Sequence, residues 1–136
     1  MKELLLDANV LVRFLVQDDP KQSAAATALF EKSERREVAL ILDGLVVAEV
    51  VYVLMGPYGR TRTEVVNVLL AIIQNAGVET MDKEVVTDAL RRFAAINLDF
   101  SDAWMAAHAA QLGHAVASFD RDFDKFKDIR RFEPKA

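Results

Sequence analysis

The sequence places four acidic residues where carboxylates could do chemistry: Asp7, Glu49, Asp102 and Asp120. They come from four separate segments and together offer only oxygen ligands. Oxygen ligands suit Mg²⁺ or Mn²⁺ better than zinc. Such ions activate water and stabilise the charged oxygens of a phosphodiester during its hydrolysis. The four carboxylates therefore indicate metal-assisted phosphodiester chemistry.

Glu49 is the most informative of the four because of its neighbours. Between Val38 and Gly59 the only charged residues are Asp43 and Glu49, and the surrounding helix reads GLVVAEVVYVLMG. A buried carboxylate without a partner costs several kcal/mol or takes up a proton. We expect Glu49 to be buried and compensated from outside its helix, with a metal ion as the compensating charge. The alternatives are an exposed position on a mostly buried helix, or an ion pair with a distant arginine.

The other acidic sites also have ordinary structural explanations. Asp7 is suited to capping a helix, and so is Asp102. Asp99 and Asp102 flank Phe-Ser at the start of one predicted helix, which brings both carboxylates to the same end of it. One of them can cap the helix while the other projects from it, so Asp99 is a possible further metal ligand.

The segment DRDFD contains Asp120, Asp122 and Asp124 and imitates the start of an EF-hand loop. That loop needs Gly at its sixth position and Glu at its twelfth. The chain has Lys125 and Arg131 there, which excludes an EF-hand. Asp122 and Asp124 remain possible metal ligands, with an acidic surface loop as the alternative.

Short apolar runs alternate with helical spacing along the chain, which predicts a parallel sheet with helices on both faces. Ligands of such folds bind beyond the carboxyl ends of the strands, and Asp7 and Asp120 each follow a predicted strand. Gly77 is expected to end one helix, Asp82 to cap the next, and Asp43-Gly44 to break the second strand. The predicted strands are 3–6, 37–42, 78–81 and 114–119, with a small one at 131–132, and the predicted helices are 8–16, 20–34, 44–55, 62–76, 83–96 and 101–112.

Composition indicates an ordinary globular protein, which we expect to form a single domain over residues 1–136. The chain has no cysteine, which excludes disulfides and thiol chemistry and suits the cytoplasm. No apolar run approaches the length of a membrane span. The net charge of −4 taken alone argues against a nucleic-acid partner, although bound divalent cations would make the field near the carboxylates much less negative.

Four segments in order resemble the motifs of PIN-domain nucleases: LLLDANVLVRFL, VVAEVVYVL, DFSDAWMAAHA and ASFDRDFDKF. The resemblance covers essentially the whole chain and carries the family's acids over to Asp7, Glu49, Asp102 and Asp120. It implies a PIN-like three-layer α/β/α sandwich whose mostly parallel central sheet has four or five strands. Asn9 and Ser118 fall at small polar positions of the motifs, where they would orient ligands or water. Asp43-Gly44 departs from the pattern without touching a catalytic position.

Because of its compact length, the chain most closely resembles the VapC-type toxins of prokaryotic toxin–antitoxin pairs. That resemblance implies an endoribonuclease that uses Mg²⁺ or Mn²⁺, forms a homodimer and is inhibited by a small cognate antitoxin protein. The apolar helices 44–55 and 62–76 also indicate a surface that meets another chain. Arg13, Arg121 and Lys125 are candidates for contacts with RNA phosphates, with solvated surface charge as the alternative.

Two other functions remain open at this point. One is a different metal-dependent phosphohydrolase, which would favour a D-x-D pair after the first strand where this chain has Asp7-Ala8-Asn9. The other is a non-catalytic PIN scaffold that binds RNA or protein, against which the complete set of four acids argues. Saturable binding of Mn²⁺ would separate an enzyme from a scaffold.

Overall fold

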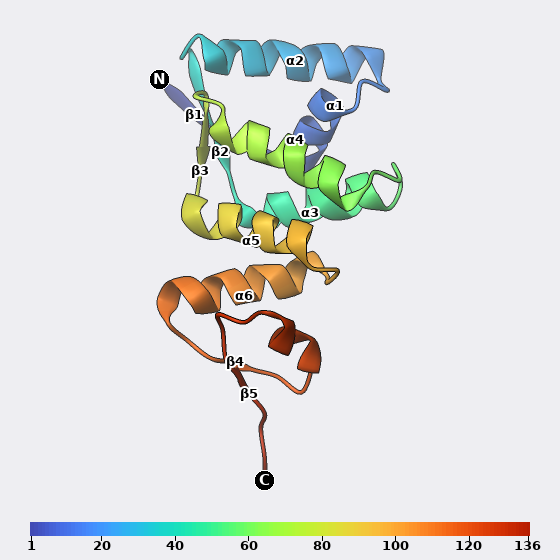
Figure 1. The fold of residues 1–136 in the computed structure, drawn as a ribbon. Coiled ribbons are helices and arrows are strands. Elements are labelled where there is room, and N and C mark those ends of the chain that lie inside the picture. Colours follow the sequence, from blue (N-terminus) through green and yellow to red (C-terminus); the bar gives the residue numbers. More distant parts are fainter. The chain divides into compact units, whose positions relative to one another are not determined.

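The computed structural model describes residues 1–136, and the chain divides into two compact units, Met1–Lys83 and Glu84–Ala136 (Figure 1). Each unit has buried apolar side chains of its own. The N-terminal unit contains β1 (Lys2–Leu5), α1 (Ala8–Leu15), α2 (Pro20–Glu34), β2 (Val38–Leu42), α3 (Gly44–Met55), α4 (Arg62–Gln74) and β3 (Val78–Thr80). None of the helices in the chain has the length and apolar character needed to cross a membrane.

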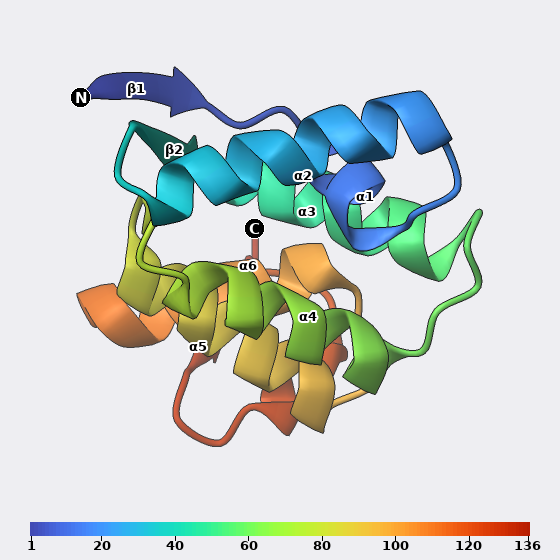
Figure 2. The same ribbon diagram turned by 90° about the horizontal axis from the view of Figure 1, so that it is seen from above.

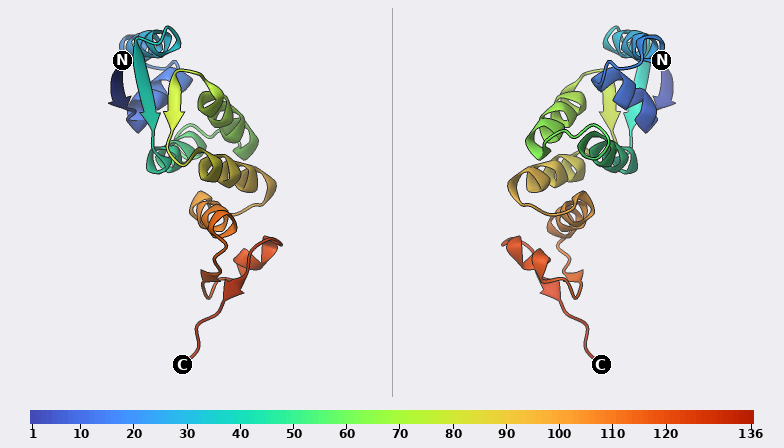
Figure 3. Two further views of the ribbon diagram at one scale, coloured as in Figure 1. Left: turned by 90° about the vertical axis from the view of Figure 1, so that its left-hand side faces the viewer. Right: turned by 90° about the vertical axis from the view of Figure 1, so that its right-hand side faces the viewer.

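The sheet of the N-terminal unit is parallel and has the strand order β1-β2-β3. Its three arrows point the same way in the side views of Figure 3. Leu5 is opposite Ile41 in the first pair of strands, and Leu42 is opposite Thr80 in the second. Helices flank this sheet, which confirms the predicted α/β/α class and its parallel strands.

Local capping explains where the helices of this unit begin. Asp19 caps α2 by accepting a hydrogen bond from the backbone of Gln22, and Pro20 suits the first turn because that position needs no N–H donor. Thr61 and Glu64 form a reciprocal capping box at the start of α4. These signals lie in the sequence itself, so the predicted starts of these helices are confirmed.

The core of the N-terminal unit consists of aliphatic side chains from the strands and helices, among them Leu11, Leu40, Val47 and Leu69. Helix α1 contacts both α2 and α3, and Figure 2 shows α2 lying across α1 and α3. Packing against neighbours on two sides fixes the direction of α1, and therefore the position of Asp7 at its start.

The C-terminal unit is built from two helices, a short strand pair and one 3₁₀ helix. Helix α6 ends at Gly113, whose φ of 73° is the left-handed conformation that glycine adopts without strain, and this end was predicted. The elements are α5 (Lys83–Ala95), α6 (Phe100–Leu112), β4 (Val116–Ala117), the 3₁₀ helix Arg121–Lys125 and β5 (Arg131–Phe132), and the core side chains are Leu98, Ala106, Ala109, Val116, Phe123 and Phe126.

The strand count differs from the expectation of four or five strands in one central sheet. The sheet has three strands, and β4 forms a separate parallel pair with β5. The predicted strand 114–119 shortens to two residues, whose ladder is completed by hydrogen bonds from Val116 N to Arg130 O and from Ser118 N to Phe132 O. So short a strand carries too little pattern for the sequence to specify the strand with which it pairs.

Two predicted helix boundaries are also wrong. Helix α4 ends before Asn75, and Gly77 instead lies against Ser33, where an added Cβ would come within 2.5 Å of the serine hydroxyl oxygen. Asp82 has a φ of 50°, so it does not have the extended conformation of a helix N-cap. Close backbone approach, rather than helix termination, therefore accounts for Gly77.

Candidate functional site

Asp7 lies directly beyond the end of β1 and caps α1. Leu6 continues the strand ladder by donating its N–H to Ile41 O, and Asp7 then turns the chain into the helix. Its Oδ2 accepts a hydrogen bond of 3.2 Å from the backbone N–H of Asn9. The side chain is exposed, and Oδ1 makes no hydrogen bond, so the cap leaves one oxygen free for another ligand.

Asp43 follows β2 at the same edge of the sheet at which Asp7 follows β1. Extending the register of Leu5 with Ile41 by two residues brings Asp7 level with Asp43. Asp43 caps α3, and its Oδ1 accepts a hydrogen bond of 2.9 Å from Leu45 N. Asp43 was expected only to end a strand, although an Asp directly after a buried apolar run is the same sequence signal that Asp7 shows.

Glu49 is exposed, so the expectation that it is buried within an apolar helix is wrong. It lies on α3 between Leu45 and Tyr52, at spacings of four and three residues, and these three side chains form one exposed stripe. Glu49 makes no hydrogen bond or ion pair with another side chain. Its role as a metal ligand remains a prediction.

The C-terminal unit brings four carboxylates into electrostatic contact. Asp102 is half-buried in the first turn of α6, and Asp99 precedes that helix without capping it through its side chain. Burial raises the pKa of Asp102, and the charges of Asp99, Asp120 and Asp122 raise it further. We call these four residues the Asp102 group.

Ser118 and Asp120 are joined by a turn that fixes the acidic end of this segment. The Ser118 hydroxyl accepts a hydrogen bond of 2.9 Å from Asp120 N. Asp120 Oδ1 accepts one of 2.8 Å from Asp122 N and so caps the 3₁₀ helix. Ser118 therefore acts on the backbone of Asp120, which is consistent with its predicted positioning role.

Asp124 belongs to a different environment, although it is only two residues from Asp122. Arg131 pairs with it through Nε to Oδ1 at 3.1 Å and Nη2 to Oδ2 at 3.3 Å. These hydrogen bonds lower the pKa of Asp124. A carboxylate held by both oxygens is a poor candidate for a metal ligand, which separates Asp124 from the Asp102 group.

The donor chemistry of the Asp102 group fits a hard divalent cation. Its carboxylate oxygens repel one another, and the only basic partner is Lys125, whose Nζ lies 3.3 Å from Asp122 Oδ1. Within either unit, however, no three His, Cys, Asp or Glu side chains come close enough together to hold a metal ion. Of the predicted acids, Asp102 and Asp120 therefore share a neighbourhood, while Asp7 and Glu49 belong to the other unit.

Comparison with known protein families gives a match. The family model described as the PIN domain matches residues 4–129, which includes all four segments that carry the predicted acids. None of the curated proteins compared with the chain is a match. PIN domains are nuclease-type domains. Since the match covers nearly the whole sequence, the chain belongs to the PIN-domain family.

Proposed function

We propose that this protein is an endoribonuclease that hydrolyses RNA phosphodiester bonds with the help of Mg²⁺ or Mn²⁺. The acids that we assign to catalysis and metal binding are Asp7, Glu49, Asp102 and Asp120. The family match runs through both compact units, which supports a single nuclease domain over residues 1–136. A cytoplasmic location, expected from the lack of cysteine, remains a prediction.

The observation that carries this proposal is the gathering of Asp99, Asp120 and Asp122 around the half-buried carboxylate of Asp102. A half-buried carboxylate beside three others is electrostatically unfavourable unless a cation neutralises the group. Arginine performs this task for other acids of the same unit but for none of these four. A hard divalent cation is the partner that such oxygen donors bind best.

When bound, the divalent ion would supply positive charge for the scissile phosphate and lower the pKa of a water that attacks it. The protein side chains position these groups. Asp102 and Asp120 would hold the cation in the C-terminal unit, with Asp99 and Asp122 adding negative charge, while Ser118 fixes the backbone of Asp120. In the N-terminal unit, Asp7 has one carboxylate oxygen without a hydrogen bond.

The direct test is incubation of the pure protein with a total RNA pool, with and without Mn²⁺, followed by mapping of the cut ends. We expect cleavage in Mn²⁺ or Mg²⁺ and none in EDTA. Asp7→Asn keeps the shape of the side chain and can still cap α1, but it removes the charge. It should abolish cleavage, and a wild-type rate in this variant would exclude Asp7 from the site.

We further propose that the protein is the toxin of a toxin–antitoxin pair and forms a homodimer. Leu45 and Tyr52 are exposed on α3 at 70% and 53%, which leaves apolar surface for another chain. Light scattering over a concentration series tests the dimer, and a purely monomeric species at high micromolar concentration would exclude it. If no small adjacent reading frame encodes a protein that co-purifies with this one, the toxin proposal fails while the nuclease proposal stands.

A further inference from the structure

A cavity of about 380 Å³ lies between α1 and α2 in the N-terminal unit. Its wall is mostly aliphatic, and three polar side chains are placed around it. The lining residues are Asn9, Val10, Arg13, Gln22, Ala25, Ala26 and Leu29. An apolar cavity with a few placed polar groups is the usual form of a site for a small organic group.

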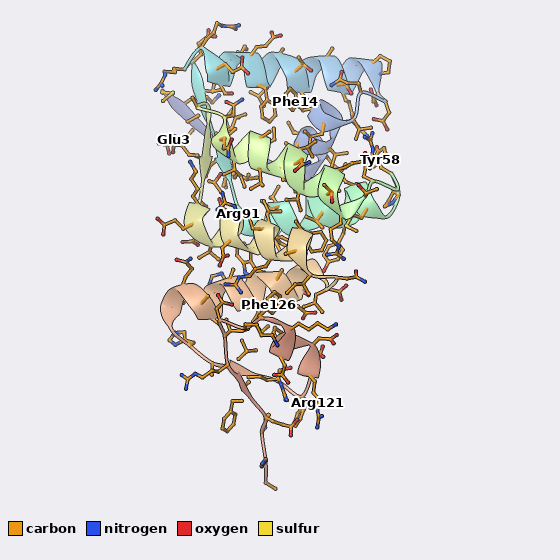
Figure 4. The ribbon with its side chains drawn as sticks, viewed as in Figure 1. Glu3, Phe14, Tyr58, Arg91, Arg121 and Phe126 are labelled. Carbon is orange, nitrogen blue, oxygen red and sulfur yellow. The ribbon has the colours of Figure 1, made fainter.

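Arg13 is held rigidly at this cavity by three partners. Its Nε donates to Gln22 Oε1 at 2.9 Å, and its Nη1 donates to Asp18 Oδ1 at 3.3 Å and to the Tyr58 hydroxyl at 3.1 Å. Tyr58, labelled in Figure 4 in the loop after α3, in turn donates to Asp18 Oδ2 at 2.7 Å. Nη2 makes no hydrogen bond, so two N–H donors of a fixed guanidinium remain available.

The hydrogen bond from Arg13 also orients the side chain of Gln22. Because Gln22 Oε1 accepts from Arg13, its Nε2 group is left as a donor without a partner. The side-chain amide of Asn9 also makes no hydrogen bond. No acidic residue lines the cavity, so its polar groups favour a ligand that presents hydrogen-bond acceptors.

The cavity adjoins one of the proposed catalytic acids. Asn9 is a lining residue, and its backbone N–H donates to the carboxylate of Asp7 at 3.2 Å. A group bound in the cavity is therefore close to the carboxyl end of β1, where Asp7 begins α1.

On the basis of the proposed function, we infer that this cavity binds one guanine base of the RNA substrate. The ring would lie against the aliphatic wall, and the acceptors O6 and N7 would face the free N–H groups of Arg13 and Gln22. Guanine is the base that offers two adjacent acceptors on one edge, whereas adenine and cytosine place an amino donor there. A phosphate could also accept from these donors, but it fits the cavity less well than a base ring, because it would face the aliphatic side chains of Val10, Ala25, Ala26 and Leu29.

Binding of the four nucleoside 5′-monophosphates in EDTA tests this inference without any catalytic readout. Calorimetric or NMR titration should show that GMP binds at least about fivefold more tightly than AMP, CMP or UMP. Equal affinity for all four nucleotides would overturn the inference. So would the absence of binding, which is the result expected of a cavity that docks a protein segment instead.

Two substitutions on α2 form a matched pair. Ala25 is exposed and lines the cavity, so Ala25→Leu should fill part of it and weaken GMP binding at least about fivefold. Ala24 is equally exposed on the same helix but does not line the cavity, so Ala24→Leu should bind GMP as the wild type does. Unchanged GMP binding in Ala25→Leu would overturn the assignment.

A third variant tests the donors themselves. Gln22→Glu still accepts the hydrogen bond from Arg13 but removes the free donor, and it should lower the preference for GMP. Retention of the full preference would contradict the proposed contacts.

Selective GMP binding in a protein that cleaves no RNA would support the base site and refute the nuclease proposal. Cleavage that depends on Asp7, without selective GMP binding, would refute the base site alone.

Discussion

Carboxylates in the C-terminal unit fall into two groups with opposite electrostatics. In the arginine-paired group, Arg92 binds Asp88 and Asp128, and Arg131 binds Asp124 and Glu133. In the Asp102 group, no arginine forms an ion pair with the carboxylates, and burial together with three neighbouring charges raises the pKa of the central residue. Pairing with arginine lowers the pKa of Asp124 and of Asp128.

The difference separates acids that stabilise the fold through ion pairs with arginine from acids that have no arginine partner. Arg92 and Arg131 each have a side chain that is only 12% exposed, so their stems are packed while their charges are neutralised. Arg92 also lies over the ring of Phe126, labelled in Figure 4, at 5.4 Å from its centroid. The Asp102 group has no such arrangement. The repulsion among its carboxylates does not stabilise the fold, so a role in binding a cation explains the group better.

The largest expected effect is on catalysis. Asp120→Asn keeps the side-chain shape but removes the charge of a proposed ligand, and we expect RNA cleavage in Mg²⁺ to fall at least about a hundredfold, equivalent to about 3 kcal/mol. Rates of cleavage of one defined RNA measure this. The control is Asp124→Asn, from the arginine-paired group, which should cleave within about threefold of the wild type. Similar losses in both variants would remove the distinction between the groups.

Next in size is the effect of breaking the arginine-paired group. Arg92→Met leaves Asp88 and Asp128 without their partner and should lower the free energy of unfolding by about 2 kcal/mol, a figure moderated by the partial exposure of both carboxylates. Urea denaturation measures it. Arg91 is the exposed neighbour without an ion pair, and Arg91→Met should change stability by less than about 0.5 kcal/mol. Equal changes in the free energy of unfolding in the two variants would show that Arg92 has no special structural role.

The pH dependence of Asp128 gives a smaller effect with a defined sign. Because the hydrogen bond from Arg92 lowers the pKa of Asp128, the folded protein favours the ionised carboxylate more than the unfolded chain does. Its stabilising contribution is present above the unfolded pKa, near about 4, and disappears as the pH falls through the folded value. Asp128→Asn should therefore lower Tm at neutral pH and have little effect near pH 2. A Tm difference that persists in acid would contradict this.

Asp102 should show the smallest effect, with the opposite sign. Its raised pKa means that its contribution to stability is present in acid and is lost as the pH rises through the folded value. Asp102→Asn should raise Tm by about 2 °C in EDTA at pH 7 and leave it unchanged near pH 3. Lower stability of this variant at pH 7 would indicate that Asp102 has a structural partner. Glu49→Gln, on an exposed stripe, should leave Tm unchanged.

Much of the fold was predictable from local signals. Proline, capping residues and apolar runs place β1, α2 and α4 within one or two residues of their observed starts. Strand pairing was less accessible, because a two-residue strand such as β4 carries too little pattern to specify its neighbour. Gly77 shows the same limit, since its contact with Ser33 joins residues distant in sequence.

The site was predictable in residue type but not in environment. Glu49 has apolar neighbours in sequence, yet Leu45 and Tyr52 share its stripe and are themselves exposed, so counting apolar residues overstated its burial. Asp43 was not predicted as a site residue, because its position level with Asp7 depends on the register of β1 and β2, which the sequence does not show. The arginine pairing of Asp124 depends on Arg131, a contact that spacing alone cannot reveal.

Titration with Mn²⁺, followed by the electron paramagnetic resonance signal of the free ion, tests most directly whether the Asp102 group binds a cation. We predict saturable binding to the wild type that is lost in the double variant Asp102→Asn/Asp120→Asn. The matched double variant Asp124→Asn/Asp128→Asn, taken from the arginine-paired group, should bind as the wild type does. No saturable binding, or the same binding by all three proteins, would contradict the assignment of the Asp102 group as the metal-binding carboxylates.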